Sequence, residues 1–451
     1  MACQLSLQQL SAILGTAPER FDPDAIATGV TTDTRQLRGG ELFIALTGQR
    51  FDGHAFLAQA AQRGAVAAVV ARPVSVELPQ FCVGNTLAAY QTLARWWRDR
   101  FAIPVIGITG SVGKTTTKEL LVAALAQHGT VLKTAGNDNN EIGVPKTLLA
   151  LDKHHEFAVI EMAMRGRGEI AQLARIARPT VGTIINVGTA HIGRLGSEAA
   201  IAEAKCELLA QLSPQQGLAV LNQDNARLMA TAARVWQGPT LTYGLEGGDV
   251  CGTLVAGDEA IAVDGRQFPL PLPGRHNARN YLAALAVLRG LGLDWQPLAA
   301  GLSVDLPGGR AQRYQLPGDI ILLDETYNAG VESMVAALQL LRDTPGQRRI
   351  AVLGRMAELG ERGPQLHARV GEAASELGLD ALLVLADGAE ARNLAAAAGG
   401  VATECWPDRQ SLLERLQGLL QPGDRVLLKA SHSVGLGEVV AALRQPADSH
   451  R

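Results

Sequence analysis

The chain has 451 residues, of which 47% are hydrophobic and 19% are charged, and its formal net charge is −3. A chain of this length exceeds what one hydrophobic core usually serves, so about three domains are expected. The absence of a basic excess argues against nucleic acid or an anionic membrane surface as a partner.

The amino-terminal stretch MACQLSLQQL lacks a charged segment followed by a long apolar core. No later stretch approaches the roughly 18 uninterrupted apolar residues of a membrane-spanning helix. We therefore expect a cytoplasmic protein without stable membrane insertion. The five cysteines form no CxxC pair, and their odd number argues against a complete disulfide framework. Nothing in the sequence indicates an oligomer, and a monomer is expected.

The first two segments both have α/β patterns. Residues 1–82 mix a strand-like run at 41–46 with a helical stretch at 56–63, which predicts a small α/β unit. From residue 103 onward, apolar runs alternate with helix-length segments, as in a mostly parallel sheet covered by helices. The clearest strands of this sheet are predicted at 103–108, Phe157–Glu161 and 181–186.

The alternation lapses between residues 237 and 273, where a Gly- and Pro-rich region predicts an antiparallel appendage. An Ala/Leu-rich helix follows at 277–290. The stretch LPGGR at 306–310 has linker composition, and beyond it the alternation restarts as a third, Rossmann-like domain. Its strands are predicted at Ile320–Asp324, Arg349–Leu353, 381–386 and Arg425–Lys429.

These patterns predict an α/β protein of three domains. They are a small α/β domain at residues 1–82, a central P-loop ATPase-like domain at 83–308 with a mostly parallel sheet, and a Rossmann-like domain at 309–451. Linkers are expected near 83–100 and 306–311, and closure around them would assemble a site and exclude water.

A phosphate-binding loop is predicted within residues 106–118 (IGITGSVGKTTTK), because a strand-like run precedes the glycines and a helical pattern follows them. Backbone N–H groups at the glycines would approach phosphate oxygens, Lys114 would bridge the β- and γ-phosphates, and Thr115 would hold Mg²⁺. Ile108 stands where the strict pattern has glycine, and the alternative is a glycine-rich turn with a solvated lysine. The predicted ATP contacts here are Thr109, Gly110, Ser111, Val112, Gly113, Lys114, Thr115 and Thr116.

Two further residues are predicted at the same sheet edge. Glu161 ends one apolar run, and His191 follows the run that ends at Asn186. Open α/β sheets bind ligands at the carboxyl ends of their strands. A carboxylate and an imidazole near ATP phosphates can hold a divalent ion, although imidazole is an unusual ligand for Mg²⁺. Taken alone, each residue is more often structural.

Longer sequence motifs occur along most of the chain beyond the phosphate loop. They are TAGNDNNEIGVP at 134–145, EMAMRGRGEI at 161–170, NVGTAHIGRLGS at 186–197, DETYNAGVESM at 324–334 and VLGRMAELG at 352–360. With the loop variant TGxxGKTT, these motifs resemble the Mur ligase family, whose loop is shared by folylpolyglutamate synthetases. Within the family they most resemble ligases that join D-alanyl-D-alanine to a UDP-N-acetylmuramoyl tripeptide.

The resemblance implies a reaction. ATP would phosphorylate the tripeptide carboxylate, and the amine of D-alanyl-D-alanine would attack the acyl phosphate, releasing ADP and phosphate. Both steps develop negative charge, so positioned cations should dominate catalysis. The expected catalytic residues are Lys114, His191 and Lys205.

The resemblance also implies Mg²⁺, two ions in all. Thr115, Glu161 and His191 would bind metal. Lys205 lies in a predicted helix at 197–212, and on its own pattern it would be a solvated lysine beside Glu203 and Glu207. The family's A-K-x-E helix instead implies that Lys205 is carbamylated and binds the second ion.

Substrate contacts are implied at three further places. For ATP they are Asn277, Asn280, Arg310 and Asp324. The first segment resembles the family's UDP-sugar-binding domain through TTDTR at 31–35 and LFIALTGQRFDGHAF at 42–56. The implied UDP-substrate contacts are Thr32, Asp33, Arg35, Asn139 and Asn140. On the D-alanyl-D-alanine side they are Tyr327 and Asn328.

The chain also departs from the family pattern. His432 stands where an arginine is expected, and the sequence leaves open whether it takes over that role. It also leaves open whether the tripeptide ends in meso-diaminopimelate or lysine. The alternatives are another Mur ligase, a folylpolyglutamate synthetase-like ligase, or a nucleotide-binding module without catalysis. The other departures are Ala163, Gly193, Glu325, Gly330 and Val331.

Overall fold

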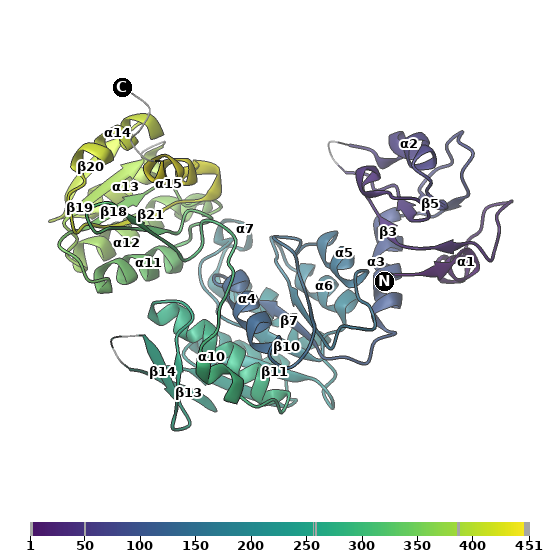
Figure 1. The fold of residues 1–451 in the computed structure, drawn as a ribbon, viewed down its shortest axis with the longest axis horizontal. Coiled ribbons are helices and arrows are strands. Elements are labelled where there is room, and N and C mark those ends of the chain that lie inside the picture. The colour runs from purple at the N-terminus through teal and green to yellow at the C-terminus, as the bar shows by residue number, and fades with distance from the viewer. Residues whose placement is uncertain (1–2, 49–50, 256, 258, 386–387, 446–451) are drawn as a thin grey trace.

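The computed structural model describes residues 3–48, 51–255, 257, 259–385 and 388–445. Three α/β units follow one another along a curved line, with the central unit between the other two (Figure 1). Each unit is built on one main sheet, of four, nine and six strands in chain order. The predicted three-part α/β architecture is confirmed.

The N-terminal unit has a parallel sheet and a small antiparallel ribbon. The strand predicted at 41–46 and the helix predicted at 56–63 are present with shorter bounds. Residues 49 and 50, within the family-like stretch 42–56, lie outside the described residues. The sheet is formed by β3 (Val30–Thr31), β4 (Leu42–Ile44), β5 (Ala67–Val70) and β6 (Gln80–Cys82), the ribbon by β1 (Leu5–Ser6) and β2 (Ile26–Ala27), and the helices are α1 (Leu7–Leu14) and α2 (Leu57–Gln62).

The prediction of a linker near residues 83–100 is wrong, because most of this segment forms helix α3 (Thr86–Arg98). Asn85 caps its first turn by accepting a hydrogen bond from the amide of Ala88. At the other end, the buried Arg98 guanidinium donates to the backbone carbonyls of Ala177, Phe101 and Arg178. The N-terminal unit is thus joined to the central unit through a packed helix.

The central sheet is parallel from β8 to β13, with the order β13-β12-β11-β10-β7-β9-β8. Its core packs helix α10 against α4 and against β11, β12 and β13. The bounds of these strands are β7 (Val105–Thr109), β8 (Val131–Lys133), β9 (Phe157–Glu161), β10 (Val181–Ile184), β11 (Leu218–Asn222), β12 (Thr240–Gly244) and β13 (Val250–Val255). The helices are α4 (Lys114–Leu125), α5 (Gly143–Leu148), α6 (Glu169–Ala177), α7 (Ile192–Leu195), α8 (Glu198–Cys206), α9 (Ala226–Val235) and α10 (Arg275–Gly290).

Two predictions for this unit need correction. The helix predicted at 197–212 ends at Cys206, because the chain there tightens into a 3-10 turn at Leu209–Gln211. The predicted antiparallel appendage holds only for β13, β14 (Ala260–Val263) and β15 (Arg266–Pro269), since β12 still pairs in parallel with β11. An Asp264-Gly265 turn with positive φ at both residues joins β14 to β15, as in a two-residue hairpin.

The C-terminal unit is the predicted Rossmann-like domain. Strand β16 (Gln312–Leu316) pairs antiparallel with β17 (Ile320–Asp324), and the remaining pairs are parallel. The predicted strand 381–386 is observed to residue 385, and residue 386 lies outside the described residues. The other elements are β18 (Arg349–Leu353), β19 (Ala381–Leu385), β20 (Ala402–Trp406), β21 (Arg425–Lys429), α11 (Val331–Asp343), α12 (Gly363–Glu376), α13 (Ala389–Ala397), α14 (Arg409–Leu419) and α15 (Leu436–Arg444).

The connection between the central and C-terminal units contains the second predicted linker. After a 3-10 turn at Gln296–Ala300, residues 301–311 form neither helix nor strand. The composition of residues 306–310 predicts an irregular connecting segment, and the structure has such a segment there. Throughout the described residues, no helix is long and apolar enough to span a bilayer.

Candidate active site

The phosphate loop predicted from sequence lies between β7 and α4. A side chain at Gly110 would collide with Ile185, and Gly113 has φ +81°, so both positions require glycine. Helix α4 begins at Lys114 and makes its first intrahelical bond from Thr117 to the carbonyl of Gly113. The preceding amides of the helix end are therefore available for an anion.

Asn186, at the end of the neighbouring strand segment, shapes this loop. Its Oδ1 accepts hydrogen bonds from the amides of Ser111 (2.9 Å) and Val112 (3.0 Å), and its Nδ2 donates to the carbonyl of Val112 (2.9 Å). The Ser111 hydroxyl accepts from the amide of Gly188 (2.9 Å). Sequence reasoning assigned no role to Asn186, although its motif had been noted.

Lys114 lies inside the loop. Its Nζ donates to the carbonyl of Gly110 (2.9 Å). Burial lowers the pKa of Lys114, while the negative charge of Glu161 opposes this shift. The Lys114 side chain is half-buried and bonded within the loop, which disfavours the alternative of a fully solvated lysine.

Glu161 and Thr115 lie together, as predicted. The Thr115 hydroxyl donates to Glu161 Oε2 (3.0 Å), and Asn139 Nδ2 donates to Glu161 Oε1 (2.8 Å). The buried Lys118 Nζ lies 3.9 Å from Glu161 Oε2 and 3.0 Å from Glu119 Oε1. Asn139, expected on the UDP-substrate side, therefore lies beside a proposed metal ligand.

His191 precedes α7 with φ +66°, a left-handed conformation that is uncommon outside glycine. Its Nδ1 lies 2.6 Å from Glu358 Oε2, a residue of the C-terminal unit. Burial and the charge of Lys114 lower the pKa of His191, although Glu358 opposes them. The imidazole is therefore biased towards its neutral, metal-binding form.

Lys205 is only 1% exposed in α8. Burial, with the nearby charge of Lys114, holds its pKa well below the usual lysine value. The alternative of a solvated lysine with ion pairs to Glu203 and Glu207 is wrong: Glu203 binds Arg167 (2.9 Å), and the Glu207 carboxylate accepts from backbone amides at the start of α6. Within the described residues, the Lys205 amine has no recorded hydrogen bond or ion pair.

A pocket of about 590 Å³ collects residues of the central and C-terminal units. Most predicted ATP and metal residues line it, and they are Val112, Gly113, Lys114, Thr115, Thr116, Glu161, His191, Asn277, Asn280 and Arg310. Asn139, predicted on the UDP-substrate side, and Tyr327 and Asn328, predicted on the D-alanyl-D-alanine side, line it too. The predicted residues that do not line it are Thr32, Asp33, Arg35, Thr109, Gly110, Ser111, Asn140, Lys205 and Asp324.

The C-terminal wall of the pocket carries two cations. The Arg310 guanidinium lies over the Tyr327 ring, 3.6 Å from its centroid. Lys429 Nζ donates to the carbonyl of Asn328 (2.9 Å) and lies 3.9 Å from Glu325 Oε2. Burial lowers the pKa of Lys429 and raises that of Glu325. Lys429 was not assigned a role from sequence.

His432, which replaces the family arginine, is exposed and does not line the pocket. Its ring packs against Tyr327, with centroids 5.6 Å apart. Asp324 Oδ1 accepts from the amide (3.1 Å) and hydroxyl (2.6 Å) of Thr326, so it shapes the start of the β17–α11 loop. In this arrangement His432 supports Tyr327 from outside the site.

The start of α10 faces the phosphate loop. A side chain at Gly113 would meet Asn280 Oδ1 at 3.0 Å. Asn277 Nδ2 donates to the carbonyl of Pro273 (2.8 Å), and Asn280 Nδ2 lies 3.3 Å from Asn277 Oδ1. Further polar residues of the pocket that sequence reasoning missed are Asn222, Asp224, Asn225, Glu246, His276 and Arg279.

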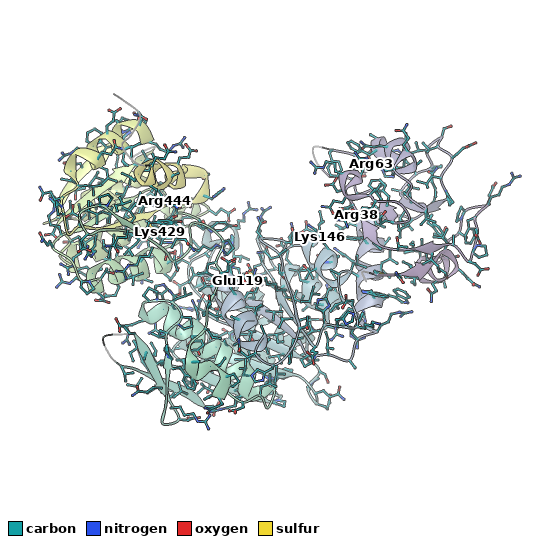
Figure 2. The ribbon with its side chains drawn as sticks, in the orientation of Figure 1. Arg38, Arg63, Glu119, Lys146, Lys429 and Arg444 are labelled. Atoms are coloured by element: carbon teal, nitrogen blue, oxygen red, sulfur yellow. The ribbon has the colours of Figure 1, made fainter. Side chains whose placement is uncertain are left out.

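Three of the residues expected to bind the UDP substrate, Thr32, Asp33 and Arg35, lie in the N-terminal unit, apart from the pocket. Asp33 caps a 3-10 turn through the amide of Arg35 (2.9 Å) and pairs with the exposed Arg35 guanidinium (2.7 Å). Figure 2 shows Arg38 and Arg63 on the same unit and Lys146 on the neighbouring part of the central unit. Asn140 instead caps α5 by accepting from the amide of Gly143 (2.9 Å).

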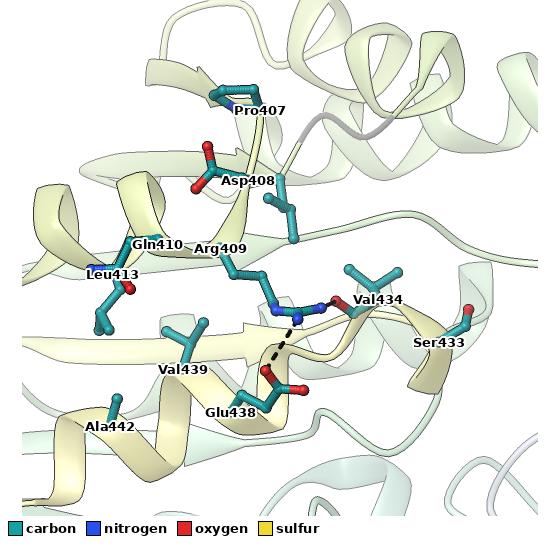
Figure 3. A pocket seen from close by; sticks show the side chains of 11 residues that line it. Pro407, Asp408, Arg409, Gln410, Leu413, Ser433, Val434, Glu438, Val439 and Ala442 are labelled. Atoms are coloured by element: carbon teal, nitrogen blue, oxygen red, sulfur yellow. Dashed lines mark hydrogen bonds and ion pairs between the residues drawn. The ribbon is translucent and has the colours of Figure 1, made fainter.

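A second hollow, of about 620 Å³, lies in the C-terminal unit beside α14 and α15 (Figure 3). Arg409 is the one cation among the described residues that line it. Its guanidinium binds Glu438 (3.1 Å) and the carbonyl of Val434 (3.0 Å). This arginine is already neutralised within the protein, so the hollow lacks the free positive charge of the interdomain pocket.

Comparison with known proteins agrees with the geometry of the pocket. Family models match residues 27–98 (Mur ligase family, catalytic domain), 108–288 (Mur ligase middle domain) and 309–432 (Mur ligase, glutamate ligase domain). The chain is 58% identical over 445 residues to the UDP-N-acetylmuramoyl-tripeptide--D-alanyl-D-alanine ligase of Synechocystis sp., covering 98% of this chain and 95% of the relative. It is 38% identical over 460 residues to the Escherichia coli ligase of the same name, covering 98% of each.

Solved structures show the same fold. MurF from Acinetobacter baumannii matches with a TM-score of 0.89 at 32% identity, covering 98% of this chain and 99% of that chain. MurF from Thermotoga maritima in complex with ADP matches with a TM-score of 0.82 at 32% identity, covering 92% and 96%. The chain therefore belongs to the Mur ligase family and is of the MurF type.

Proposed function

We infer that the protein uses ATP to join D-alanyl-D-alanine to UDP-N-acetylmuramoyl-tripeptide, a step of peptidoglycan precursor synthesis. The inference is carried by one observation: a phosphate loop, a carboxylate–hydroxyl pair and cations of two units line a single pocket. The 58% identical relative bears the name of this reaction. Because ATP and UDP-linked precursors are cytoplasmic substrates, the proposal places the enzyme in the cytoplasm.

The chemistry requires activation, because attack of an amine on a carboxylate would have to expel oxide. A carboxylate oxygen of the tripeptide attacks the γ-phosphorus, and the bond from that phosphorus to the bridging oxygen of ADP breaks. The amine of D-alanyl-D-alanine then attacks the acyl carbon of the acyl phosphate. The C–O bond breaks, phosphate leaves, and the ammonium proton passes to solvent or to a pocket base.

The chain's own groups stabilise the charge that develops in these steps. The free amides at the start of α4 and the Lys114 ammonium would hold the β- and γ-phosphates. Arg310 and Lys429 face the same space from the C-terminal unit. Fixed cations in a partly enclosed pocket stabilise transition-state charge more strongly than they would in water.

The donor set fits Mg²⁺ bound together with ATP. Glu161 and Thr115 offer oxygens beside the phosphate loop, and His191 lines the same pocket. Within the described residues, no group of three His, Cys, Asp or Glu side chains is placed to hold a metal. Phosphate oxygens and water would therefore complete the coordination, which is usual for Mg²⁺. When bound, Mg²⁺ neutralises phosphate charge and polarises the γ-phosphoryl group.

A carbamate on Lys205 would supply a further oxygen ligand. Burial lowers the pKa of Lys205 and so favours the neutral amine, which is the form that adds to carbon dioxide. Its nitrogen bonds to the carbon and one proton is released, so the neutral amine becomes a carbamate anion. The lack of a recorded carboxylate partner for Lys205 supports this proposal.

The remaining roles follow the arrangement of the three units. Asn277 and Asn280 are proposed to contact adenine, with Asp324 shaping the nearby loop. Thr32, Asp33 and Arg35 are proposed to bind the UDP part of the precursor, with Asn139 and Asn140 towards the tripeptide. The proposed contacts of D-alanyl-D-alanine are Tyr327 and Asn328.

An amine screen tests this function. Purified protein with Mg²⁺, ATP and either the lysine or the meso-diaminopimelate form of UDP-muramoyl tripeptide is offered D-alanyl-D-alanine, D-glutamate, L-alanine or L-lysine. ADP release should depend on D-alanyl-D-alanine. Dependence on another amine would indicate another amide ligase. Release independent of any amine would indicate ATP hydrolysis without ligation, and no release at all would indicate a nucleotide-binding module.

A further inference from the structure

The C-terminal unit contacts the turn that contains His191. His191 Nδ1 lies 2.6 Å from Glu358 Oε2, and the amide of Gly193 donates to the Glu358 carbonyl at 3.3 Å. A Cβ atom at Gly193 would lie only 2.6 Å from the backbone nitrogen of Gly360. This close approach is possible because residue 193 is glycine. Mur ligases often have an acidic residue at this position.

The loop that carries Glu358 is held by hydrogen bonds within the C-terminal unit. It follows β18, in a loop whose Met356 amide donates to His367 Nε2 (2.9 Å) and whose Ala357 amide donates to the Ser431 hydroxyl (2.9 Å). Glu358 itself has φ +64°, so a costly backbone conformation is maintained where its side chain reaches His191.

His191 and Glu358 lie in different places relative to the interdomain pocket. His191 lines the interdomain pocket, whereas Glu358 does not. Among the described residues that line the pocket, Glu358 has a side-chain bond to His191, while its other carboxylate oxygen lies 3.8 Å from the Arg194 guanidinium outside the pocket. A metal-binding histidine commonly donates its second N–H to a carboxylate, which fixes the tautomer and the ring orientation.

We propose that Glu358 is a positioning residue that holds the proton of His191 on Nδ1 and so presents Nε2 as the metal-binding atom. Because Glu358 belongs to the C-terminal unit, the metal site is complete only when that unit is docked on the central unit. The inference rests on the proposed metal-binding role of His191. It adds a residue that controls this role and couples it to domain docking.

A second acidic contact provides a matched control. Glu332 of α11 accepts from the amide (2.8 Å) and hydroxyl (3.1 Å) of Thr189, on the same loop as His191. This contact also joins the two units, but it does not touch the imidazole. Substitution of Glu332 therefore weakens docking without removing the hydrogen-bond partner of Nδ1.

The test uses Mn²⁺ with ADP bound to the full-length enzyme. Electron spin echo modulation reports a nitrogen atom coordinated to Mn²⁺, and titration gives the Mn²⁺ affinity. The wild type should show imidazole nitrogen modulation that His191→Ala removes. Glu358→Ala should also lose it, with a drop of about 10- to 100-fold in affinity. Glu358→Gln should retain it because the amide oxygen accepts the same hydrogen bond, and Glu332→Ala should retain it as well.

The outcomes are separable. Unchanged modulation and affinity in Glu358→Ala would overturn the inference, and equal losses in Glu358→Ala and Glu332→Ala would overturn it in favour of docking alone. No nitrogen modulation in the wild type would remove the metal role of His191 on which the inference stands. Amine-dependent ADP release by the same wild-type sample reports independently whether the proposed ligase function holds. Circular dichroism and the folded Glu358→Gln variant exclude misfolding as the cause.

Discussion

The Gly193→Ala substitution probes the contact between the central and C-terminal units directly. The added Cβ would lie 2.6 Å from the nitrogen of Gly360 and 2.9 Å from the carbonyl oxygen of Glu358, both backbone atoms. An ordinary contact would require a withdrawal of about 0.8 Å or more. Gly193 is not among the residues with positive φ, so the expected effect is steric and not conformational.

The magnitude follows from how the clash is relieved. Crowding of this kind costs about 1–3 kcal/mol if the units remain docked. If they separate instead, this energy opposes formation of the closed enzyme, which corresponds to a loss of roughly 5- to 150-fold in kcat/KM. The free energy of unfolding should change little, because undocking removes the clash without opening either core.

Amine-dependent ADP release gives kcat/KM, and small-angle scattering reports whether the units separate. Gly84→Ala is the matched control, because its Cβ would meet no atom within 4 Å and its φ is not positive. Wild-type kcat/KM in Gly193→Ala would refute the argument that docking at this contact is needed. Equal losses in both variants would show a general effect of the alanine substitution.

Three other substitutions test residues in or near the proposed active site. Lys114→Ala removes the ammonium of the phosphate loop and should lower ADP release by at least about 100-fold without shifting the unfolding transition; retained activity would contradict its role. Lys205→Ala should be inactive but partly restored by a short carboxylic acid, whereas full activity without additive would reject the carbamate. Burial, with the charges of Lys429 and Arg279, lowers the pKa of His276 to about 4. Since the unfolded chain binds this proton near pH 6.5, stability should fall as pH drops from about 6.5 to about 4, and the fall should be smaller in His276→Gln. Urea unfolding across this pH range measures the difference, and equal slopes would contradict the assignment.

Local chemistry made much of the site predictable. The glycines around Lys114 are required by the backbone itself, since Gly113 has positive φ and Gly110 packs against Ile185. The strand ending at Glu161 was predicted with its observed bounds, because a fully buried parallel strand gives a continuous apolar run. The carboxyl-edge rule then brought Glu161 to the phosphate loop.

Contacts between distant segments were not predictable in the same way. The segment 83–100 was taken as a linker, although Asn85 is a strong capping residue and the apolar face of α3 packs on the central unit. The partners of Asn186 and Glu358 depend on how loops and units meet in space. Lys205 shows the same limit, since its neighbouring glutamates suggested a solvated face while packing buries the amine.

The packed helix α3 also limits motion of the N-terminal unit relative to the central unit. Arg98 ties the end of this helix to backbone carbonyls of the central unit, and the Trp97 indole donates to the carbonyl of Leu151 (2.9 Å). The connection at 301–311 has no comparable helix. Closure is therefore expected mainly as motion of the C-terminal unit towards the phosphate loop and His191.

Formation of a peptide bond by the purified enzyme tests the central claim most directly. Protein is incubated with Mg²⁺, ATP, UDP-N-acetylmuramoyl tripeptide and D-alanyl-D-alanine, and the products are resolved by mass spectrometry. The proposed site predicts a UDP-linked pentapeptide formed in equal amount with ADP and phosphate. A tripeptide recovered unchanged from folded, ATP-binding protein would contradict the proposed function.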